Sequence, residues 1–546
     1  MPAKLADPFY YLNNFQTVLD WIGARHRALL DSAEQRFIDT FPTLPRPARA
    51  LLVRMVMRKG ELFRAGKLRY TEIGSTTAAL APLLRHGWVD DRPAIGLERL
   101  FALLTKGEIS ALFSAHLDNN RLAKADMLAA LAPRFPQEQC FEQWRGAEDE
   151  RLYALTIGPL CERLRLMFFG NLHQDWSEFV LAELGLVRYE QPPLSGNAWA
   201  FRHRGDVDVY LGLHRCRERF EAGEATTAVL AALPADVADN PWLQSRRAKL
   251  LFQIAWQNER EGDAESALAL YEQSGWSGAR LRRIRVLERA RDWRAALALA
   301  RAAQLEPENE AESQQLARIL PRLQRRLGLP VAARPAAAAY ARLDLELAPP
   351  QPFQCVEFCV RDHLTNAAEP VFYVENTLIN ALFGLLCWPA IFAPVPGAFF
   401  HPFQTGPADL LHPDFKARRA DLFAACFELL DSGEYRQRMQ RCFVDKHGLQ
   451  SPFVHWEILS APLLALALDC IPAQHLKLYF TRLLGDIGAN RSGLPDLIQF
   501  YPARRDYRLI EVKGPGDRVQ DNQRRWLDYC VQWSLPVAVC HVRWVQ

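Results

Sequence analysis

The stretch "LPDLIQFYPARRDYRLIEVKG", residues 494–514, predicts two short strands joined by a tight polar turn. A hairpin closing around Ala503–Tyr507 pairs these strands antiparallel and sets Asp496 opposite the end of the second strand. Side chains two positions apart share one face of a strand, so Glu511 and Lys513 point the same way. We therefore expect two carboxylates and an ammonium group at one end of an otherwise apolar ribbon.

Such a cluster suits metal-dependent hydrolysis. Two neighbouring carboxylates repel each other unless a cation lies between them, and oxygen ligands suit Mg²⁺ or Mn²⁺. An ion held by Asp496 and Glu511 can activate water and stabilise charge on a phosphoryl oxygen, while Lys513 orients the water or offsets that charge. The spacing D-x(14)-E-x-K is common, however, and taken alone it favours a structural ion pair in which Lys513 bridges the two acids.

The flanking sequence supports the metal interpretation. Tight-turn residues precede the aspartate at 493–495 and follow the lysine at 514–517. A helix is expected over 517–533, with Asp517 as its N-cap, and a last strand over Val537–Val542. Helix, strand, strand, helix and strand around D…E-x-K form the pattern of a restriction-endonuclease-like α/β core.

Composition excludes several classes of protein. A chain of 546 residues predicts three or four packed units, and 49% hydrophobic with 24% charged residues excludes a disordered chain. The net charge of +3 says nothing about an acidic partner. Eleven cysteines without a CxxC pair argue against a disulfide scaffold and a zinc module, and for reduced thiols in a cytoplasmic protein.

One uncharged segment could be mistaken for a membrane span. Residues 378–400 carry no charge, but three prolines interrupt them, which leaves about a dozen helical residues. We expect a buried core helix followed by a loop. The first fifteen residues lack the pattern of a signal peptide, so neither a membrane anchor nor export is expected.

The first part of the chain, residues 1 to about 205, is expected to be mostly helical. Its segment 41–70 has one acidic residue, Glu61, and eight basic ones, which suits contact with a nucleic-acid backbone; a solvated helix face is the simpler alternative. A helix, a leucine-rich turn and a second helix are expected over 97–131. The eight basic residues are Arg46, Arg49, Arg54, Arg58, Lys59, Arg64, Lys67 and Arg69.

The middle of the chain predicts helical repeats. "EGDAESALALY" (261–271) and "ARDWRAALALA" (290–300) align at Asp263 and Asp292, a period of 29, and alternating Ala and Leu let helices approach closely. We interpret this region as tetratricopeptide-like. The Pro- and Ala-rich stretch 328–352 is expected to be a linker.

Several stretches resemble the Fanconi-associated nuclease family, in the family's order. At the C-terminal end they are "SGLPDLIQF" (492–500), "LIEVKGPGDRVQDNQRRWL" (509–527) and "VAVCHV" (537–542). Earlier in the chain they are "MRKGELFRAGKLRYTEIG" (57–74), the repeat block and "VENTLINALFGLLCWPAIF" (374–392). The resemblance spans most of the chain and implies a C-terminal VRR-NUC domain, a member of the restriction-endonuclease-like superfamily, in a bacterial-type protein.

The resemblance also implies site residues. It assigns catalysis to Asp496, Glu511 and Lys513, metal binding to Glu375, Asp496, Glu511 and the main-chain carbonyl of Val512, and a polar helper role to Gln523. The family's further acid ligates metal from a helix; without the family, Glu375 could equally cap a helix N-terminus. Gln523 could equally lie on a solvated helix face.

The resemblance further implies branched DNA as the substrate and Mg²⁺ or Mn²⁺ as the cofactor. The implied activities are 5′-flap endonuclease and 5′-to-3′ exonuclease, in interstrand-crosslink repair. The 97–131 helices would be SAP-like, and a basic pocket would receive a 5′-terminal phosphate. Arg217 and Lys249 are the candidates for this pocket, within a larger basic set that ordinary repeat-surface charge explains equally well: Arg215, Arg219, Arg246, Arg247 and residues 280–285.

Eukaryotic members carry a ubiquitin-binding zinc finger, which is not expected here because no cysteine precedes Cys140. A cytoplasmic, nucleoid-associated enzyme is expected, and dimerisation on DNA is left open. Alternative functions are another restriction-like nuclease, such as a junction resolvase, and a non-catalytic helical-repeat DNA-binding scaffold. A partner-binding role of the repeats alongside catalysis is a third option.

The sequence thus predicts a multidomain, mainly α-helical chain with an α/β nuclease core. Its expected segments are 1–90 (basic, DNA-binding helices), 91–205 (SAP-like region and linker helices), 206–327 (repeats), 328–352 (linker) and 353–546 (nuclease domain).

Overall fold

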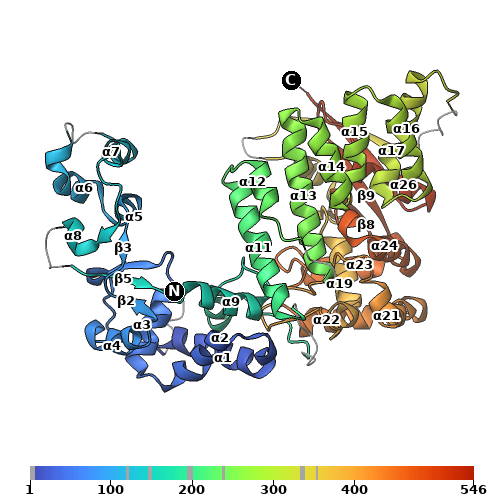
Figure 1. The fold of residues 1–546 in the computed structure, drawn as a ribbon. Helices are drawn as coiled ribbons and strands as arrows, with labels where there is room; N and C mark the ends of the chain where they lie inside the picture. Colours follow the sequence, from blue (N-terminus) through green and yellow to red (C-terminus); the bar gives the residue numbers. More distant parts are fainter. Residues whose placement is uncertain are drawn as a thin grey trace. The chain divides into compact units, whose positions relative to one another are not determined.

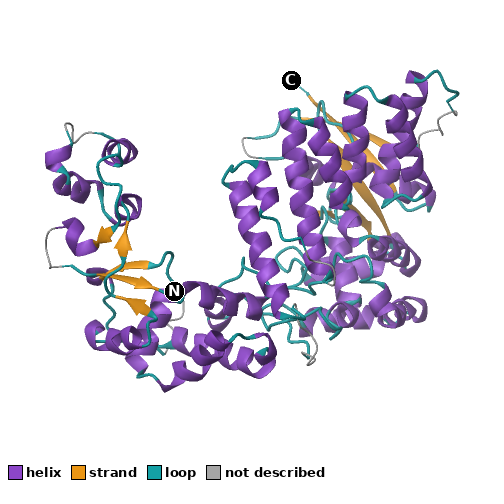
Figure 2. Ribbon diagram, viewed as in Figure 1, coloured by secondary structure: helices purple, strands orange, loops and turns teal. Residues whose placement is uncertain are grey.

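The structure is a computed structural model that describes residues 7–117, 122–145, 150–193, 201–235, 240–331, 339–351 and 354–545. The chain divides into two compact units, residues 1–186 and 187–546, and each is described by itself. Helices dominate both units, while the largest sheet lies in the second (Figures 1 and 2). This confirms the predicted class, a mainly helical chain with an α/β core at its C-terminal end.

The first unit combines helices with a small sheet. Helix α1 (Tyr10–Arg25) buries residues spaced three or four apart, which gives it one apolar face. The three-stranded sheet, in the order β1-β5-β2, was not expected from the sequence, because its strands of two to four residues are too short for an alternating pattern. Its strands are β1 (Leu62–Arg64), β2 (Val89–Asp90) and β5 (Leu152–Leu155), and the neighbouring helices are α2 (Ser32–Thr40), α3 (Arg46–Val56), α4 (Thr76–Arg85), α9 (Gly158–Phe169) and α10 (Ser177–Glu183).

The expected helix pair at 97–131 is instead three short helices. Thr105 and Glu108 form a capping box, which begins a new helix directly after the leucine-rich first one. A two-stranded ladder, β3 (Ala94–Ile95) with β4 (Gln139–Cys140), closes this region. The helices are α5 (Leu97–Leu103), α6 (Lys106–Leu112) and α7 (Lys124–Leu131), followed by α8 (Phe141–Arg145).

The second unit begins with the predicted helical pairs. Asp263 and Asp292, aligned in the sequence repeat, are the N-caps of equivalent helices and accept backbone N–H groups at 3.1 and 3.0 Å. Buried alanines such as Ala267 and Ala296 bring neighbouring helices together. The helices are α11 (Arg204–Glu221), α12 (Thr226–Ala231), α13 (Pro241–Glu261), α14 (Ala264–Ser274), α15 (Ala279–Arg289), α16 (Trp293–Leu305) and α17 (Glu310–Arg326).

A five-stranded sheet in the order β6-β10-β9-β8-β7 forms the C-terminal core. The predicted hairpin is confirmed: β8 (Leu497–Tyr501) pairs antiparallel with β9 (Asp506–Lys513), and Leu497 faces Ile510. Strand β10 (Val537–Trp544) runs parallel to β9, and β7 (Val371–Tyr373) borders β8. The helices of this core are α18 (Val356–Leu364), α19 (Leu378–Leu386), α20 (Trp388–Ile391), α21 (Ala420–Ser432), α22 (Tyr435–Asp445), α23 (Ala461–Cys470), α24 (Ala473–Gly485), α25 (Ile487–Asn490) and α26 (Asp521–Gln532).

The uncharged segment folds as expected. Every residue of α19 is buried in the core, and the short α20 and a loop follow it. Among the described residues, no helix combines the length and the apolar character needed to cross a membrane.

Two expectations were wrong. The stretch 328–352 is not a linker throughout, because 341–347 form β6 (Ala341–Leu347), which pairs in parallel with β10; residues 332–338 and 352 lie outside the described part. Helix α26 begins at Asp521 rather than at 517, with Gln520 as its N-cap. Asp517 accepts the backbone N–H of Gly514 at 3.2 Å and so closes the preceding turn instead.

Candidate active site

Asp496 lies directly before β8, where two hydrogen bonds fix it. Its backbone carbonyl accepts the N–H of Val374 at 2.8 Å, and its Oδ2 accepts the N–H of Val512 at 2.7 Å. The side chain is only 5% exposed. The aspartate therefore bridges to β9 where the backbone ladder of the hairpin ends, opposite the second strand as predicted.

Glu511 and Lys513 complete the predicted cluster. The Nζ atom of Lys513 lies 2.7 Å from Oε1 of Glu511, and both residues project from the same face of β9. Glu511 is fully buried, and neither of its oxygens accepts a well-formed hydrogen bond from a described residue. Buried carboxylate oxygens without such partners are rare, and they call for a ligand such as a metal ion.

Burial changes the acidity of both carboxyl groups. Burial raises the pKa of Asp496 to about 6, against the lowering effect of the Val512 N–H and with a further rise from the charge of Glu375. Burial and the charge of Asp496 raise the pKa of Glu511 to about 8, although Lys513 lowers it. At neutral pH the metal-free pair therefore holds a proton that a divalent cation would displace.

Glu375 lies in the turn between β7 and α19, not on a helix as expected. It does not cap the helix either, because the N-cap is Thr377. Its Oε2 accepts the hydroxyl of Tyr373 at 2.6 Å, and its Oε1 accepts Nδ2 of Asn376 at 3.1 Å. Its charge acts on both Asp496 and Glu511, so the third acid belongs to the same electrostatic cluster.

The residues present fit a divalent cation. Within the described residues, no three His, Cys, Asp or Glu side chains are already arranged as a complete metal site. Glu511 nevertheless offers Oε2 without a partner and Oε1 with only the Lys513 ion pair, and Asp496 keeps Oδ1 free of the Val512 bond. Because the N–H and C=O of one strand residue point to the same side, the carbonyl of Val512 faces the Asp496 side as well. Two carboxylates and one carbonyl are hard oxygen ligands of the kind Mg²⁺ and Mn²⁺ prefer.

Gln523 is used for helix capping. Its Oε1 accepts the backbone N–H of Gln520 at 2.9 Å in the first turn of α26, and no described contact joins it to the carboxylates. The first turn of α26 also packs closely against Gly493, in the segment that leads to Asp496. Gly493 has φ +88°, and a Cβ there would lie 2.7 Å from the carbonyl carbon of Asn522.

A clasp between α17 and the nuclease core was not predicted, because no local pattern in the sequence indicates it. The guanidinium of Arg318 binds both carboxylate oxygens of Asp521, at 2.8 and 2.5 Å, and Gln315 donates to the same carboxylate at 3.0 Å. Glu310 pairs with Arg482 of α24 at 2.6 Å. The last repeat helix is thereby bound to the start of α26 and to α24.

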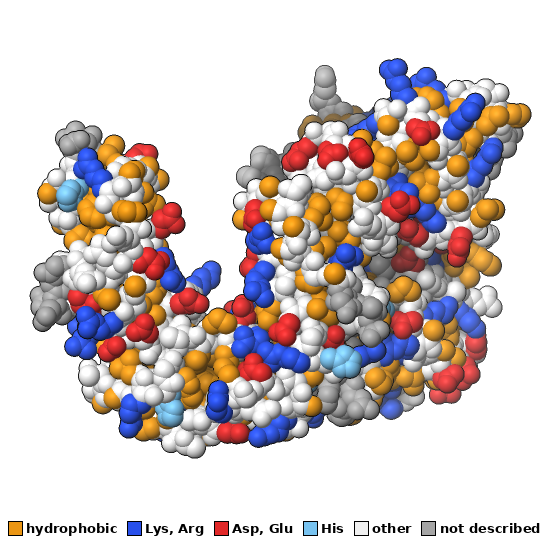
Figure 3. Space-filling view, in the orientation of Figure 1, with side chains coloured by type: hydrophobic (Ala, Val, Ile, Leu, Met, Phe, Trp, Pro, Cys, Tyr) orange, Lys and Arg blue, Asp and Glu red, His pale blue; other side chains and the backbone are white. Residues whose placement is uncertain are grey.

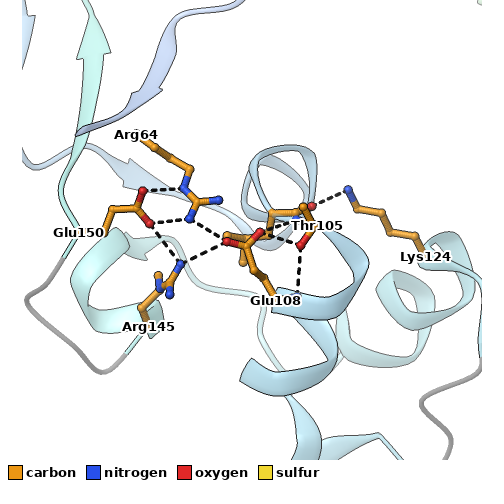
Figure 4. A network of polar contacts seen from close by, with 7 residues as sticks. Arg64, Thr105, Glu108, Lys124, Arg145 and Glu150 are labelled. Atoms are coloured by element: carbon orange, nitrogen blue, oxygen red, sulfur yellow. Dashed lines mark hydrogen bonds and ion pairs between the residues drawn. The ribbon is translucent and has the colours of Figure 1, made fainter. Parts of the chain in front are cut away.

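Two members of the basic 41–70 segment have structural roles. Arg54 pairs with Glu72 at 2.6 Å, and Arg64 pairs with Glu108 at 2.7 Å and Glu150 at 2.5 Å (Figure 4). The hydrogen bond from Arg64 and that from the Thr105 backbone lower the pKa of Glu108 to about 2. Glu72 lies just outside the segment, 18 residues from Arg54, and Glu150 lies 86 residues from Arg64, so the charge counted within 41–70 was misleading for these two arginines.

Arg46 lies 3.9 Å from Asp7, and Arg49 is only partly exposed. The remaining four basic residues of the segment are exposed on the surface. None of them has an ion-pair partner among the described acidic residues, and Arg58 also donates to the carbonyl of Lys67 at 3.2 Å. They are Arg58, Lys59, Lys67 and Arg69.

Arg217 and Lys249 are exposed on the adjacent helices α11 and α13. Arg246, a member of the larger basic set, lies between them in sequence, and its guanidinium is 4.4 Å from the ring centre of Tyr210 and 4.5 Å from that of Trp242. Burial, together with the charge of Arg217, lowers the pKa of Arg246. Trp242 and Arg246 are four residues apart on one helix, which is the signal that could have found this pair.

Other cations of the larger basic set are neutralised within the repeats. Arg280, Arg282 and Arg283 pair with glutamates at 2.6 to 3.0 Å. On the face drawn in Figure 3, blue and red side chains are interspersed over the repeat helices, without a single-sign stripe. Ordinary repeat-surface charge therefore explains these three arginines.

Three family models match the chain. The model described as "FAN1, HTH domain" matches residues 9–90, "Fanconi anemia-associated nuclease SAP domain" matches 94–144 and "VRR-NUC domain" matches 431–544. The last range contains Asp496, Glu511 and Lys513 but not Glu375, β6 or β7.

The chain is also similar to whole proteins. A Pseudomonas aeruginosa protein named "Fanconi-associated nuclease 1 homolog" is 56% identical over 99% of this chain and 97% of its own length. An Oryza sativa homologue is 25% identical over 97% of this chain and 62% of its own length. A crystal structure described as paFAN1 bound to 2-nucleotide 5′-flap DNA with a gap matches with a TM-score of 0.96 and 56% identity over the full length of both chains. A second, with a 1-nucleotide 5′ flap and a gap, matches with a TM-score of 0.93, 56% identity and coverage of 99% of this chain and 100% of that one.

Proposed function

This chain belongs to the Fanconi-associated nuclease family, and from that premise we propose that it is a divalent-metal-dependent DNA nuclease that cleaves near 5′ flaps. The observation that carries the proposal is the buried Glu511, whose two oxygens lack well-formed hydrogen bonds beside Asp496 and Lys513. A structural ion pair would be expected to satisfy those oxygens, whereas a metal site needs them open.

In the proposed reaction, Asp496, Glu511 and the carbonyl of Val512 would hold Mg²⁺ or Mn²⁺, and Glu375 would add a fourth oxygen donor. Such an ion would supply an activated water and offset charge on the phosphoryl group. Glu511 would have to be ionised to act as a ligand, because its raised pKa keeps a proton on it near neutral pH. Lys513 donates a hydrogen bond to the attacking water or to a phosphoryl oxygen.

The proposed substrate is branched DNA with a 5′ flap. The relative in the two solved structures is described as bound to such DNA, and it shares 56% of its residues with this chain. The exposed cations of the first unit suit contacts with the phosphate backbone. By family resemblance we extend the proposal to 5′-to-3′ exonuclease activity and to a role in interstrand-crosslink repair.

Arg217, Arg246 and Lys249 are proposed to receive the 5′-terminal phosphate. Burial lowers the pKa of Arg246 with the help of Arg217, and no described carboxylate pairs with Arg246, so an anion bound there would relieve the repulsion between the two arginines. The flat rings of Tyr210 and Trp242 hold the guanidinium in place.

The test is cleavage of end-labelled 5′-flap DNA in Mn²⁺, with and without the 5′-phosphate. We expect defined cuts near the flap junction, their loss with EDTA and in Asp496→Ala, and retained flap binding by that variant. Without the 5′-phosphate, or in Arg246→Gln, the cut positions should spread. Preferred cleavage of four-way junctions would favour a resolvase, and flap binding without any cleavage would favour a non-catalytic scaffold.

A further inference from the structure

A left-handed residue separates Glu375 from the helix that follows it. Asn376 has φ +52°, one of only four described residues other than glycine with a positive φ. Asparagine enters this region more readily than most residues, and glycine enters it freely. The positive φ in the turn from β7 into α19 therefore explains why Asn or Gly is favoured at this position. It does not explain why the side chain should be an amide.

The amide group of Asn376 connects two segments of the site. Its Oδ1 accepts the backbone N–H of Leu494 at 3.1 Å, and its Nδ2 donates to Oε1 of Glu375 at 3.1 Å. A backbone N–H can only donate, so the amide oxygen must face Leu494 and the nitrogen must face the carboxylate. One side chain thus joins Glu375 to the segment two residues before Asp496.

Further hydrogen bonds hold this connection in place. The buried Asn380 donates to the carbonyl of Asn376 at 2.7 Å and to the carbonyl of Arg491 at 2.9 Å. The hydroxyl of Tyr373 donates to the other oxygen of Glu375. Both oxygens of Glu375 are therefore oriented by hydrogen bonds from neighbours, whereas those of Glu511 accept no well-formed hydrogen bond.

We propose that Asn376 is a positioning residue of the metal site, which sets the place of Glu375 relative to Asp496 and so the affinity of the carboxylates for a divalent cation. The inference rests on the proposed function. Hydrogen bonds that orient a ligating carboxylate commonly change metal affinity about 10- to 100-fold. Asn376 is well placed for this role because its two bonds end on Glu375 and on the segment that leads into Asp496, two of the three segments that carry the proposed ligands.

The test is Asn376→Gly in the full chain. Glycine adopts a positive φ without strain and keeps the carbonyl that Asn380 binds, but it lacks the amide. Mn²⁺ affinity, measured without DNA by electron paramagnetic resonance of the free ion, is expected to fall about 10- to 100-fold. Flap cleavage should fall at low Mn²⁺ and recover to within a few-fold of the parent at saturating Mn²⁺.

Arg505→Gly is the matched control. Arg505 has φ +50° in the turn at the opposite end of the hairpin from Asp496 and Glu511. Glycine there relieves the same left-handed backbone strain without touching the proposed metal ligands. Its Mn²⁺ affinity should equal that of the parent. Asn376→Asp keeps an acceptor for Leu494 but replaces the donor to Glu375 with a repelling oxygen, so the pH of half-maximal Mn²⁺ binding should rise.

The outcomes separate the two proposals. Unchanged Mn²⁺ affinity in Asn376→Gly, or an equal loss in Arg505→Gly, would overturn the positioning role of Asn376. If Asn376→Gly fails to fold, an unchanged pH of Mn²⁺ binding in Asn376→Asp would overturn it instead. A parent protein that neither binds Mn²⁺ nor cleaves flap DNA would overturn the proposed function itself.

Discussion

The backbone N–H of Val512 donates a 2.7 Å hydrogen bond to the side chain of Asp496, just beyond the last pair of the β8–β9 hairpin, Leu497 with Ile510. The carboxylate of Asp496 accepts the kind of hydrogen bond that a backbone carbonyl accepts elsewhere in the hairpin. The bond locks the register of the two strands, and it uses one oxygen of Asp496 while leaving the other available. One hydrogen bond therefore both pairs the strands and places the proposed metal ligand Asp496.

The first prediction concerns pH. The pKa of Asp496 is raised to about 6 and that of Glu511 to about 8, so their protonated forms favour the folded state. The stability that these two groups contribute is complete below about pH 4 and is lost as the pH rises through 6 and 8, at on the order of 1.4 kcal/mol per unit of pKa shift. The melting temperature of the metal-free protein should therefore fall between pH 5 and pH 9. This fall should be larger than the one measured for Glu511→Gln over the same pH range.

Mn²⁺ should reverse this loss, and more strongly at pH 9 than at pH 5, because the ion binds the ionised carboxylates. Calorimetric titrations at pH 7 in two buffers of different ionisation enthalpy should show protons released on binding. Binding without proton release would contradict the raised pKa of Glu511.

The second prediction concerns Lys513→Met. Without the ammonium 2.7 Å from Glu511, the pKa of Glu511 should rise further and its deprotonation should need a higher pH. The single-turnover cleavage rate at pH 7.5 should fall by about 100-fold or more, and the residual pH profile should shift upward. Flap DNA affinity serves as the control and should stay near that of the parent. A parent-like pH profile would argue against this role.

The third prediction separates two uses of the 41–70 segment. Lys59→Ala and Lys67→Ala remove exposed cations, so each should weaken flap binding and lower the salt dependence of the binding constant by about 0.9 for each phosphate that is no longer neutralised. Arg64→Ala removes the closer arginine from two half-buried glutamates, which keep Arg145 at 3.6 and 3.2 Å, and it should lower the free energy of unfolding by about 1–3 kcal/mol. Filter binding over a salt series and urea unfolding distinguish the two effects. A salt slope unchanged in both lysine variants would remove them from the DNA interface.

The fourth prediction concerns the clasp between α17 and α26. Arg318→Ala breaks a partly exposed pair, so it should cost only about 0.5–1 kcal/mol of stability. Hydrogen exchange should become faster in the first turn of α26. The matched control, Arg322→Ala, lies one turn along the same helix and breaks an equivalent pair with Glu288 of α15. It should speed exchange in α15 and leave α26 unchanged; the same response in both variants would show that no specific clasp exists.

The hairpin and its charged end could be predicted because their signals are local. Alternation, a short polar turn and the spacing of Asp496, Glu511 and Lys513 are all contained in 494–514, and the structure brings these three residues together. The repeat period was equally local, since Asp263 and Asp292 cap equivalent helices.

What the sequence did not reveal depends on distant partners. Strand β6 pairs with β10 almost 200 residues later. The prolines and alanines around it indicate a linker more strongly than the alternation in "ARLDLEL" indicates a strand. Arg64 meets Glu150, 86 residues away, so a count of neighbouring charges could not show its neutralisation. The turn at Asn376 is set by its bond to Leu494, more than 100 residues later.

The parallel pairing of β6 with β10 also governs how the catalytic part can be separated from the rest. A recombinant fragment starting at 353, the predicted boundary, would uncover the full outer edge of β10, and one limited to 431–544 would lose β7 and Glu375 as well. Bare strand edges are templates for intermolecular addition, so such fragments should self-associate. A stable minimal nuclease must include Ala341–Leu347.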